Sequence, residues 1–154
     1  MPSRLRFCVR RYPAGDPDAR TTVVTLSVPT DIDCIEEAVA LVTFHCLSGT
    51  AARETVRFRL QVALSEALAN AIIRGNHGDR SKLVRVRAEL GADAIRIHVT
   101  DEGAGFDPAA VPEPLGPEGL QRANGRGLFL IRSLVDAVEF NDRGNSICMI
   151  LRRP

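Results

Sequence analysis

The chain has 154 residues, of which 45% are hydrophobic and 25% are charged. These values argue against a disordered chain and predict one globular domain over residues 1–154. The formal net charge is only +1, so we expect neither direct binding to nucleic acid nor binding to an anionic membrane. The N-terminus has no apolar stretch typical of a secretion signal, and we expect a cytoplasmic protein.

Two residue types exclude specific kinds of site. Lys82, the one lysine among 20 basic residues, lies outside any GxxxxGK[ST] motif, which excludes a P-loop. The chain has no CxxC motif and no cysteine with a histidine at metal-ligand spacing. We therefore interpret all four cysteines as small buried hydrophobic side chains: Cys8, Cys34, Cys46 and Cys148.

The first part of the chain is rich in alternating β-branched residues. This pattern predicts two strands, over residues 4–11 and 21–28. Asp31 then offers an N-cap for a helix over about 32–48, whose apolar residues follow helical spacing.

An apolar stripe from Leu60 to Ala71 predicts a second helix, over about 53–74, with Gly75 as the residue that terminates it. Two clean alternations of polar and apolar residues follow. They predict a hairpin of strands over 83–90 and 94–100, each with one buried face.

The last part of the chain contains a long loop. Residues 107–126 include four prolines, and loops of this length are usually functional or disordered. A third helix is predicted from about Gly127, followed by strands over 137–141 and 146–152. The predicted fold class is α+β: a two-layer sandwich in which three helices cover one face of a mainly antiparallel mixed sheet.

Glu66 and Asn70 lie four residues apart, so they share one face of the second predicted helix, beside its apolar stripe. Polar groups at the edge of a core need partners, because burying them unpaired is costly. One interpretation is a hydrated Mg²⁺ held by Asn70, with a carboxylate that accepts a proton nearby. The alternative is an ordinary polar pair on a solvated face.

Two glycine-rich segments follow. Residues 101–106 (Asp-Glu-Gly-Ala-Gly-Phe) come directly after a predicted strand, where glycines let the backbone approach a ligand and Asp101 can accept a hydrogen bond from an amine. Residues 125–128 (Gly-Arg-Gly-Leu) precede the third helix, whose N-terminus suits phosphate. A plain turn and a flexible junction are the respective alternatives. Taken together, the three features favour a nucleotide site closed by the long loop.

These segments carry a family resemblance. Residues 66–76 resemble the N-box of the Bergerat-fold ATPases, and residues 101–107 and 125–128 resemble their G1 and G2 boxes. Residues 63–73 and 127–136 are similar to bacterial anti-sigma-factor serine/threonine kinases, which belong to the histidine-kinase-like ATPases.

The resemblance implies a role for individual residues. Glu66 would be the general base, Asn70 would ligate Mg²⁺, and Asp101 would bind the adenine amino group of ATP. Residues 107–126 would form the ATP lid. The other nucleotide-binding residues implied are Arg74, Gly103, Gly105, Phe106, Gly125, Arg126, Gly127 and Leu128. Arg74 stands where the family usually has a histidine.

The resemblance also implies a function. The chain would be an ATP-dependent serine/threonine protein kinase that acts as an anti-sigma factor. Its substrate would be a STAS-type anti-anti-sigma protein, its second partner a sigma factor, and its assembly a homodimer. One alternative is an ATP-binding module that sequesters a regulator without phosphotransfer. Another is a switch that controls a different output. Glu66 favours the kinase, because a pure binder needs no base at that position.

Overall fold

The computed structural model describes residues 4–13, 20–47, 54–107, 109 and 126–153. Their strands form one sheet in the order β1-β2-β3-β4-β6-β5, and every pairing is antiparallel. The strands are β1 (Arg6–Pro13), β2 (Arg20–Pro29), β3 (Leu83–Leu90), β4 (Ala94–Thr100), β5 (Ala137–Phe140) and β6 (Ser146–Arg152). The helices are η1 (Ile32–Cys34), α1 (Ile35–Leu47), α2 (Glu54–Asn70), η2 (Ala71–Gly75) and α4 (Arg126–Leu134).

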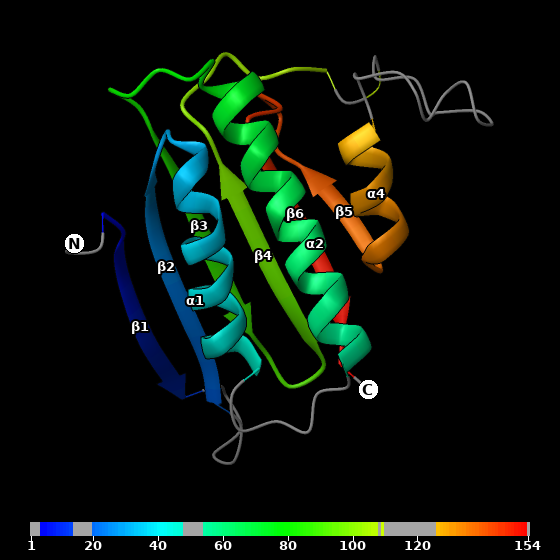
Figure 1. Cartoon of the computed structure of the whole chain (residues 1–154). Coiled ribbons are helices and arrows are strands. Elements are labelled where there is room, and N and C mark those ends of the chain that lie inside the picture. The colour runs from blue at the N-terminus through cyan, green and yellow to red at the C-terminus, as the bar shows by residue number, and fades with distance from the viewer. Residues whose placement is uncertain (1–3, 14–19, 48–53, 108, 110–125, 154) are drawn as a thin grey trace.

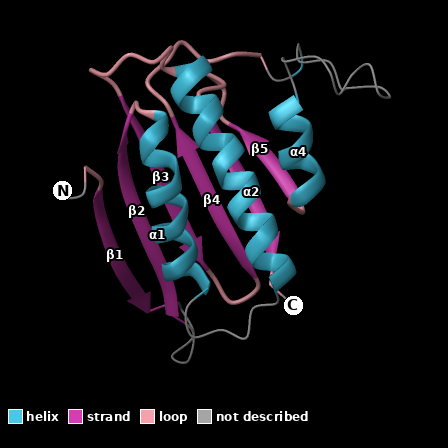
Figure 2. Cartoon of the chain, viewed as in Figure 1, coloured by secondary structure: helices cyan, strands magenta, loops and turns pink. Residues whose placement is uncertain are grey.

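The helices α1, α2 and α4 lie on the same side of the sheet (Figures 1 and 2). The predicted two-layer α+β fold is therefore confirmed. Strand alternation explains it: Ile95, Ile97 and Val99 of β4 are buried under the helices, and the residues between them project to the other side. We call that other side, which carries Arg85, Arg87 and Arg96, the open face. No helix among the described residues covers it.

The start of the first helical segment follows the predicted capping. Asp31 has an extended backbone (φ −152°), and its Oδ1 accepts a hydrogen bond from the backbone N–H of Asp33 at 3.0 Å. A short 3₁₀ turn, η1, leads from this cap into α1. The predicted helix over 32–48 is thus two elements, and its expected end at residue 48 lies outside the described residues.

The end of the second helix differs from the prediction. The last turn, η2, is a π-helix, and its C-cap is Asn76 rather than Gly75. The positive φ angles come later, at His77 (51°) and Gly78 (68°). Gly75 therefore does not act as the left-handed terminator. It is a site of close approach, because a Cβ atom there would overlap the carboxylate of Asp101.

The prediction for the cysteines holds for three of them and is wrong for Cys8, which is exposed. Cys8 lies on β1, the edge strand, and its register with Thr25 places it on the open face. A sequence pattern does not show which face of a strand a helix will cover. None of the described helices is both long and apolar enough to cross a bilayer.

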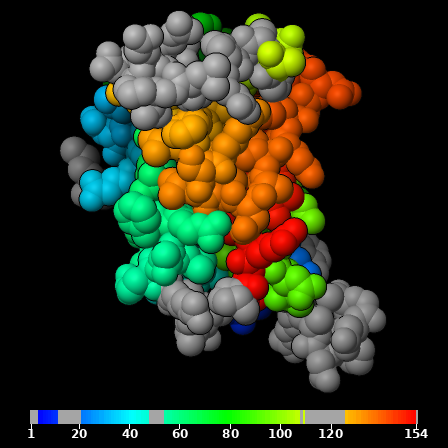
Figure 3. All heavy atoms as spheres, turned by 90° about the vertical axis from the view of Figure 1, so that its right-hand side faces the viewer, coloured from blue at the N-terminus to red at the C-terminus, as the bar shows by residue number. Residues whose placement is uncertain are grey.

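The right-hand side of the molecule is closed by α4 and β5. Figure 3 shows that they form one continuous surface, with the first turns of α2 beside it. Arg59 of α2 fixes this arrangement, because its side chain donates a hydrogen bond to the backbone oxygen of Leu134 at the end of α4. Its guanidinium also lies 3.5 Å from a carboxylate oxygen of Asp136. The position of α4 matters because its first turn borders a cavity between this helix and α2.

Candidate functional site

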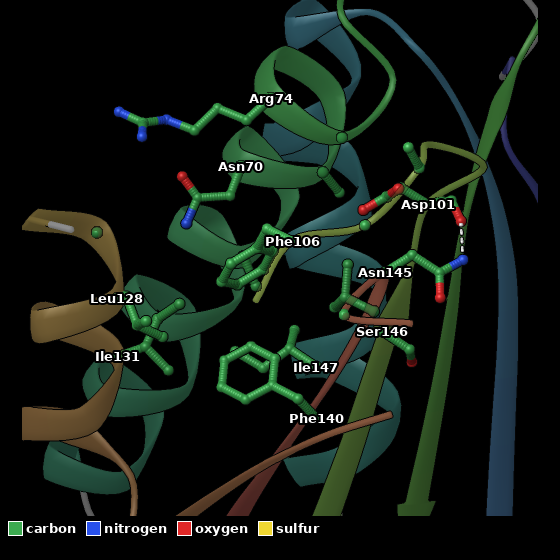
Figure 4. A pocket seen from close by; sticks show the side chains of 18 of the residues that line it. Asn70, Arg74, Asp101, Phe106, Leu128, Ile131, Phe140, Asn145, Ser146 and Ile147 are labelled. Atoms are coloured by element: carbon green, nitrogen blue, oxygen red, sulfur yellow. Dashed lines mark hydrogen bonds between the residues drawn. The ribbon is translucent and has the colours of Figure 1, made fainter. Parts of the chain in front are cut away.

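A cavity of about 440 Å³ lies between α2, η2, α4 and the end of the sheet. This volume is in the usual range for a small-molecule site. Figure 4 shows side chains from all these elements pointing into it. Of the site residues predicted from the sequence, seven line it: Asn70, Arg74, Asp101, Gly105, Phe106, Gly127 and Leu128.

Asp101 stands at the inner end of the cavity, where β4 ends. One carboxylate oxygen accepts a hydrogen bond from the backbone N–H of Gly103 at 2.8 Å. Burial raises the pKa of the Asp101 carboxyl above its usual value, and the hydrogen bond from Gly103 opposes that shift. The second carboxylate oxygen accepts no hydrogen bond from the described residues, so Asp101 has acceptor capacity for a ligand amine.

The backbone around Asp101 is held by Asn145 of the β5–β6 turn. The Asn145 side chain donates to the carbonyl oxygen of Asp101 at 3.0 Å, and the Asp101 N–H donates to the carbonyl oxygen of Asn145 at 2.9 Å. Further on, Gly105 has a φ of 83° and lies so close to Arg143 that a Cβ atom would overlap the carbonyl oxygen of that residue. Both features fix the glycine-rich segment against the turn.

Asn76 connects the helix end to the sheet. It is fully buried, and its amide donates hydrogen bonds to Oγ1 of Thr30 at 3.0 Å and to the carbonyl oxygen of Leu83 at 3.1 Å. Its Oδ1 accepts from the N–H of Glu102 at 2.8 Å. One side chain therefore ties η2 to the ends of β2 and β3 and to the glycine-rich segment.

Glu66 and Asn70 are both half-buried and lie on one face of α2, as the spacing predicts. They face the first turn of α4 at Gly127. A Cβ atom on Gly127 would lie 2.9 Å from Oε2 of Glu66 and 3.2 Å from Nδ2 of Asn70. Asn70 and Arg74 project from successive turns toward the same side (Figure 4). The arrangement brings a carboxylate, an amide and a guanidinium to the mouth of the cavity.

The remaining wall of the cavity is apolar. Phe106 and Phe140 meet edge to face with ring centroids 5.5 Å apart, and Leu128, Ile131 and Ile147 continue the surface. An apolar wall together with the Asp101 carboxylate, which can accept a hydrogen bond, is suited to a planar heterocycle that carries an amine.

Comparison with known proteins agrees with this geometry. A model of the family described as "Histidine kinase-like ATPase domain" matches residues 28–151.

The chain belongs to the histidine kinase-like ATPase domain family.

Among curated relatives, the "Serine-protein kinase RsbW" of Listeria innocua is 31% identical over 114 residues, which cover 67% of this chain and 73% of that protein. The "Anti-sigma F factor" of Clostridium perfringens is 37% identical over 97 residues, covering 58% of this chain and 68% of the relative. The same factor of Clostridium beijerinckii is 31% identical over 98 residues, covering 61% and 68% respectively.

Some predicted residues of this histidine kinase-like ATPase domain do not line the cavity. Gly103 is buried behind Asp101, where a side chain would overlap the backbone of Gly75. Glu66 does not line the cavity itself, but its carboxylate faces Gly127, which does. Arg126 is the exposed first residue of α4. Gly125 and most of the predicted lid over residues 107–126 lie outside the described residues.

The sequence also left some site residues unassigned. Phe140, Asn145, Ser146 and Ile147 line the cavity, although the sequence predicted them only as the last two strands and their turn. Asn76 was part of the N-box resemblance without a role of its own. A usable signal for it was the polar residue next to Gly75 at the end of an apolar helix, where a buried amide must find several partners.

The donor set of the site agrees with a hydrated Mg²⁺. Mg²⁺ takes oxygen ligands and keeps several waters, and the amide oxygen of Asn70 is the protein oxygen that would hold it. Among the residues that the structure describes, no group of three His, Cys, Asp or Glu side chains is placed to hold a metal ion.

Proposed function

We propose that this protein is an ATP-dependent serine/threonine protein kinase that acts as an anti-sigma factor. The observation that carries the proposal is the placement of Glu66 and Asn70 against Gly127, beside a cavity that ends at Asp101. The names of the relatives, serine-protein kinase and anti-sigma F factor, support the same activity. A cytoplasmic location is part of the proposal.

In the proposed reaction, Asp101 accepts a hydrogen bond from the adenine amine, and Phe106 and Phe140 contact the base. Arg74, Arg126 and the first turn of α4 face the phosphates, where positive charge and N–H groups are favourable. Mg²⁺, when bound at Asn70, supplies charge neutralisation at the phosphates. Gly125 belongs to this phosphate site in the proposal.

Glu66 is the proposed general base. The hydroxyl oxygen of a substrate serine or threonine bonds to the γ-phosphorus, and the bond from that phosphorus to the bridging oxygen of ADP breaks. The hydroxyl proton passes to the Glu66 carboxylate, and ADP leaves. The proposed substrate is a STAS-type anti-anti-sigma protein, and the proposed second partner is a sigma factor.

A homodimer is part of the proposal. An exposed aromatic cluster supports it: Phe7 of β1 is 52% exposed and Phe44 of α1 is 63% exposed. Both rings lie near His45, with centroids at 5.9 and 5.1 Å from the imidazole. Exposed aromatic side chains are enriched in protein interfaces.

The test uses γ-labelled ATP and purified STAS-type proteins encoded by the same genome. Glu66→Gln keeps the shape of the side chain and removes the base. It should retain ATP binding and lose transfer by about 10²-fold or more. Glu54→Gln, on the exposed first turn of the same helix, is the matched control and should transfer normally.

Two outcomes would contradict the proposal. Normal transfer by Glu66→Gln would show that Glu66 is not the base. Saturable ATP binding and partner binding without transfer by the wild-type protein would favour the second candidate, a module that sequesters its partner without phosphotransfer.

A further inference from the structure

The open face of the sheet concentrates positive charge. The strand registers place the following charged residues on it: Arg6 and Arg10 of β1, Arg85, Arg87 and Glu89 of β3, Arg96 of β4, Arg152 of β6 and Glu139 of β5. The open face thus carries six arginines and two glutamates, whereas the whole chain carries a formal charge of only +1. The six arginines and two glutamates leave this face with an excess of four positive charges.

The six arginines of this face are exposed. Arg87 pairs with Glu89 at 2.8 Å. The structure shows no ion pair or side-chain hydrogen bond that joins Arg6, Arg85 or Arg152 to another described residue. A guanidinium presents five donors in a planar fork, which matches a carboxylate in two-point contact.

The spread of these arginines sets the size of the ligand. Arg6 on β1 and Arg152 on β6 lie four strand spacings apart, about 19 Å across the sheet, and the registers also place them at opposite ends of their strands. A single small anion cannot contact both. The match is an extended surface with several negative charges, comparable in breadth to one side of a standard protein interface.

The other side chains of the open face indicate the chemical class of the ligand that it can bind. Cys8, Thr25, Ser27, Thr100 and Ser146 are small. Among the side chains that the structure describes on this face, the His98 ring is half-buried and no Phe, Tyr or Trp is exposed, so this part of the face is poorly suited to base stacking. The apolar Val23 is buried and Ile150 is half-buried, so neither provides an exposed wedge for a lipid surface.

We propose that the open face binds a protein partner whose contact surface is rich in aspartate and glutamate. The contact would be electrostatic and would leave the cavity accessible, because the cavity lies on the helix side between α2 and α4. The proposal does not depend on kinase activity.

A fluorescent peptide of about 20 glutamates, similar in length to one side of a standard interface, is the probe. Wild-type protein should bind it with an affinity that falls as salt is raised. The triple variant Arg6→Glu/Arg85→Glu/Arg152→Glu should bind at least about tenfold more weakly, since each change replaces an attraction with a repulsion. The matching Gln variant should show an intermediate loss.

The matched control reverses three arginines on the helix side: Arg11→Glu, Arg57→Glu and Arg132→Glu. It alters the net charge by the same amount and should keep the affinity within about twofold, because local rather than total charge decides the contact. Circular dichroism and ATP binding confirm that each variant is folded.

Equal losses in the open-face and control variants would overturn the proposal, as would no binding of the peptide by the wild-type protein. A short DNA duplex and vesicles containing phosphatidylserine are tested in parallel. Tighter binding of either one than of the peptide, lost with the same open-face arginines, would replace the acidic protein with nucleic acid or membrane.

Discussion

The carboxylate of Asp101 occupies the space that a Cβ atom on Gly75 would fill. The end of η2 and the end of β4 therefore touch directly, although the two residues are far apart in the chain. The contact fixes one wall of the cavity relative to the proposed adenine acceptor. Glycine at position 75 is needed for space, since its φ is not in the left-handed region.

Gly75→Ala should displace the Asp101 carboxylate. We expect ATP binding to weaken by about tenfold or more, together with a loss of about 1–3 kcal/mol in the free energy of unfolding from overpacking. Isothermal calorimetry and urea denaturation measure the two effects. Gly91→Ala is the control, because its added Cβ would meet only the Ala94 oxygen, at 3.4 Å. Unchanged ATP affinity in Gly75→Ala would show that Asp101 does not bind the adenine base.

Gly127→Ala should separate stability from function. The added methyl group would press on the flexible ends of Glu66 and Asn70, so both side chains must move. Alanine also favours helix by about 0.8–1 kcal/mol over glycine. We therefore expect an equal or higher melting temperature with weaker Mg²⁺–ATP binding and slower phosphotransfer.

Ser133→Ala tests whether any change in α4 has the same effect. Among the described residues, its hydroxyl donates a hydrogen bond to the backbone oxygen of Phe129 in the preceding turn and to no other group. This variant should bind Mg²⁺–ATP normally. Normal nucleotide binding by Gly127→Ala as well would argue against a site between α2 and α4.

The sequence was sufficient for features that depend on local periodicity. The strands predicted over 83–90 and 94–100 coincide with β3 and β4, because each has one buried and one solvated face and alternates cleanly. The spacing of Glu66 and Asn70 likewise placed them on one side of α2.

Features that depend on distant partners were not accessible from the sequence. The role of Asn76 rests on Thr30 and Glu102, which are 46 and 26 residues away. The charge of the open face depends on the register of neighbouring strands, so a net charge of +1 concealed it. Gly75 is a contact site rather than a helix terminator, and this could be recognised only once the position of Asp101 was known.

Asn76→Ala should be strongly destabilising. It removes three hydrogen bonds from a fully buried side chain and leaves the N–H of Glu102 and the oxygen of Leu83 without this partner. At about 1 kcal/mol for each bond, we expect a loss of about 3 kcal/mol in the free energy of unfolding. Urea denaturation measures it.

Asn141→Ala is the control for Asn76→Ala. Asn141 also makes three side-chain hydrogen bonds, to Asn145 and Ser146, but it is exposed. Water can replace those bonds, so its loss should be clearly smaller. Equal losses in the two variants would show that the buried position of Asn76 has no special importance.

Asp31 should make the stability of the protein depend on pH. The N–H of Asp33 and the guanidinium of Arg4, 2.7 Å away, lower the pKa of the Asp31 carboxyl below its usual value of about 3.9. Because the folded-state pKa is depressed, the stabilisation is present above the unfolded pKa and is lost as pH falls through the folded pKa. At neutral pH, Asp31→Asn should therefore be less stable than the wild-type protein, and the difference should shrink below about pH 4. Urea denaturation at several pH values measures this, with Asp142→Asn on the exposed β5–β6 turn as the control for net charge. A difference that stayed constant down to pH 2 would show that the effect of Asp31→Asn is not electrostatic.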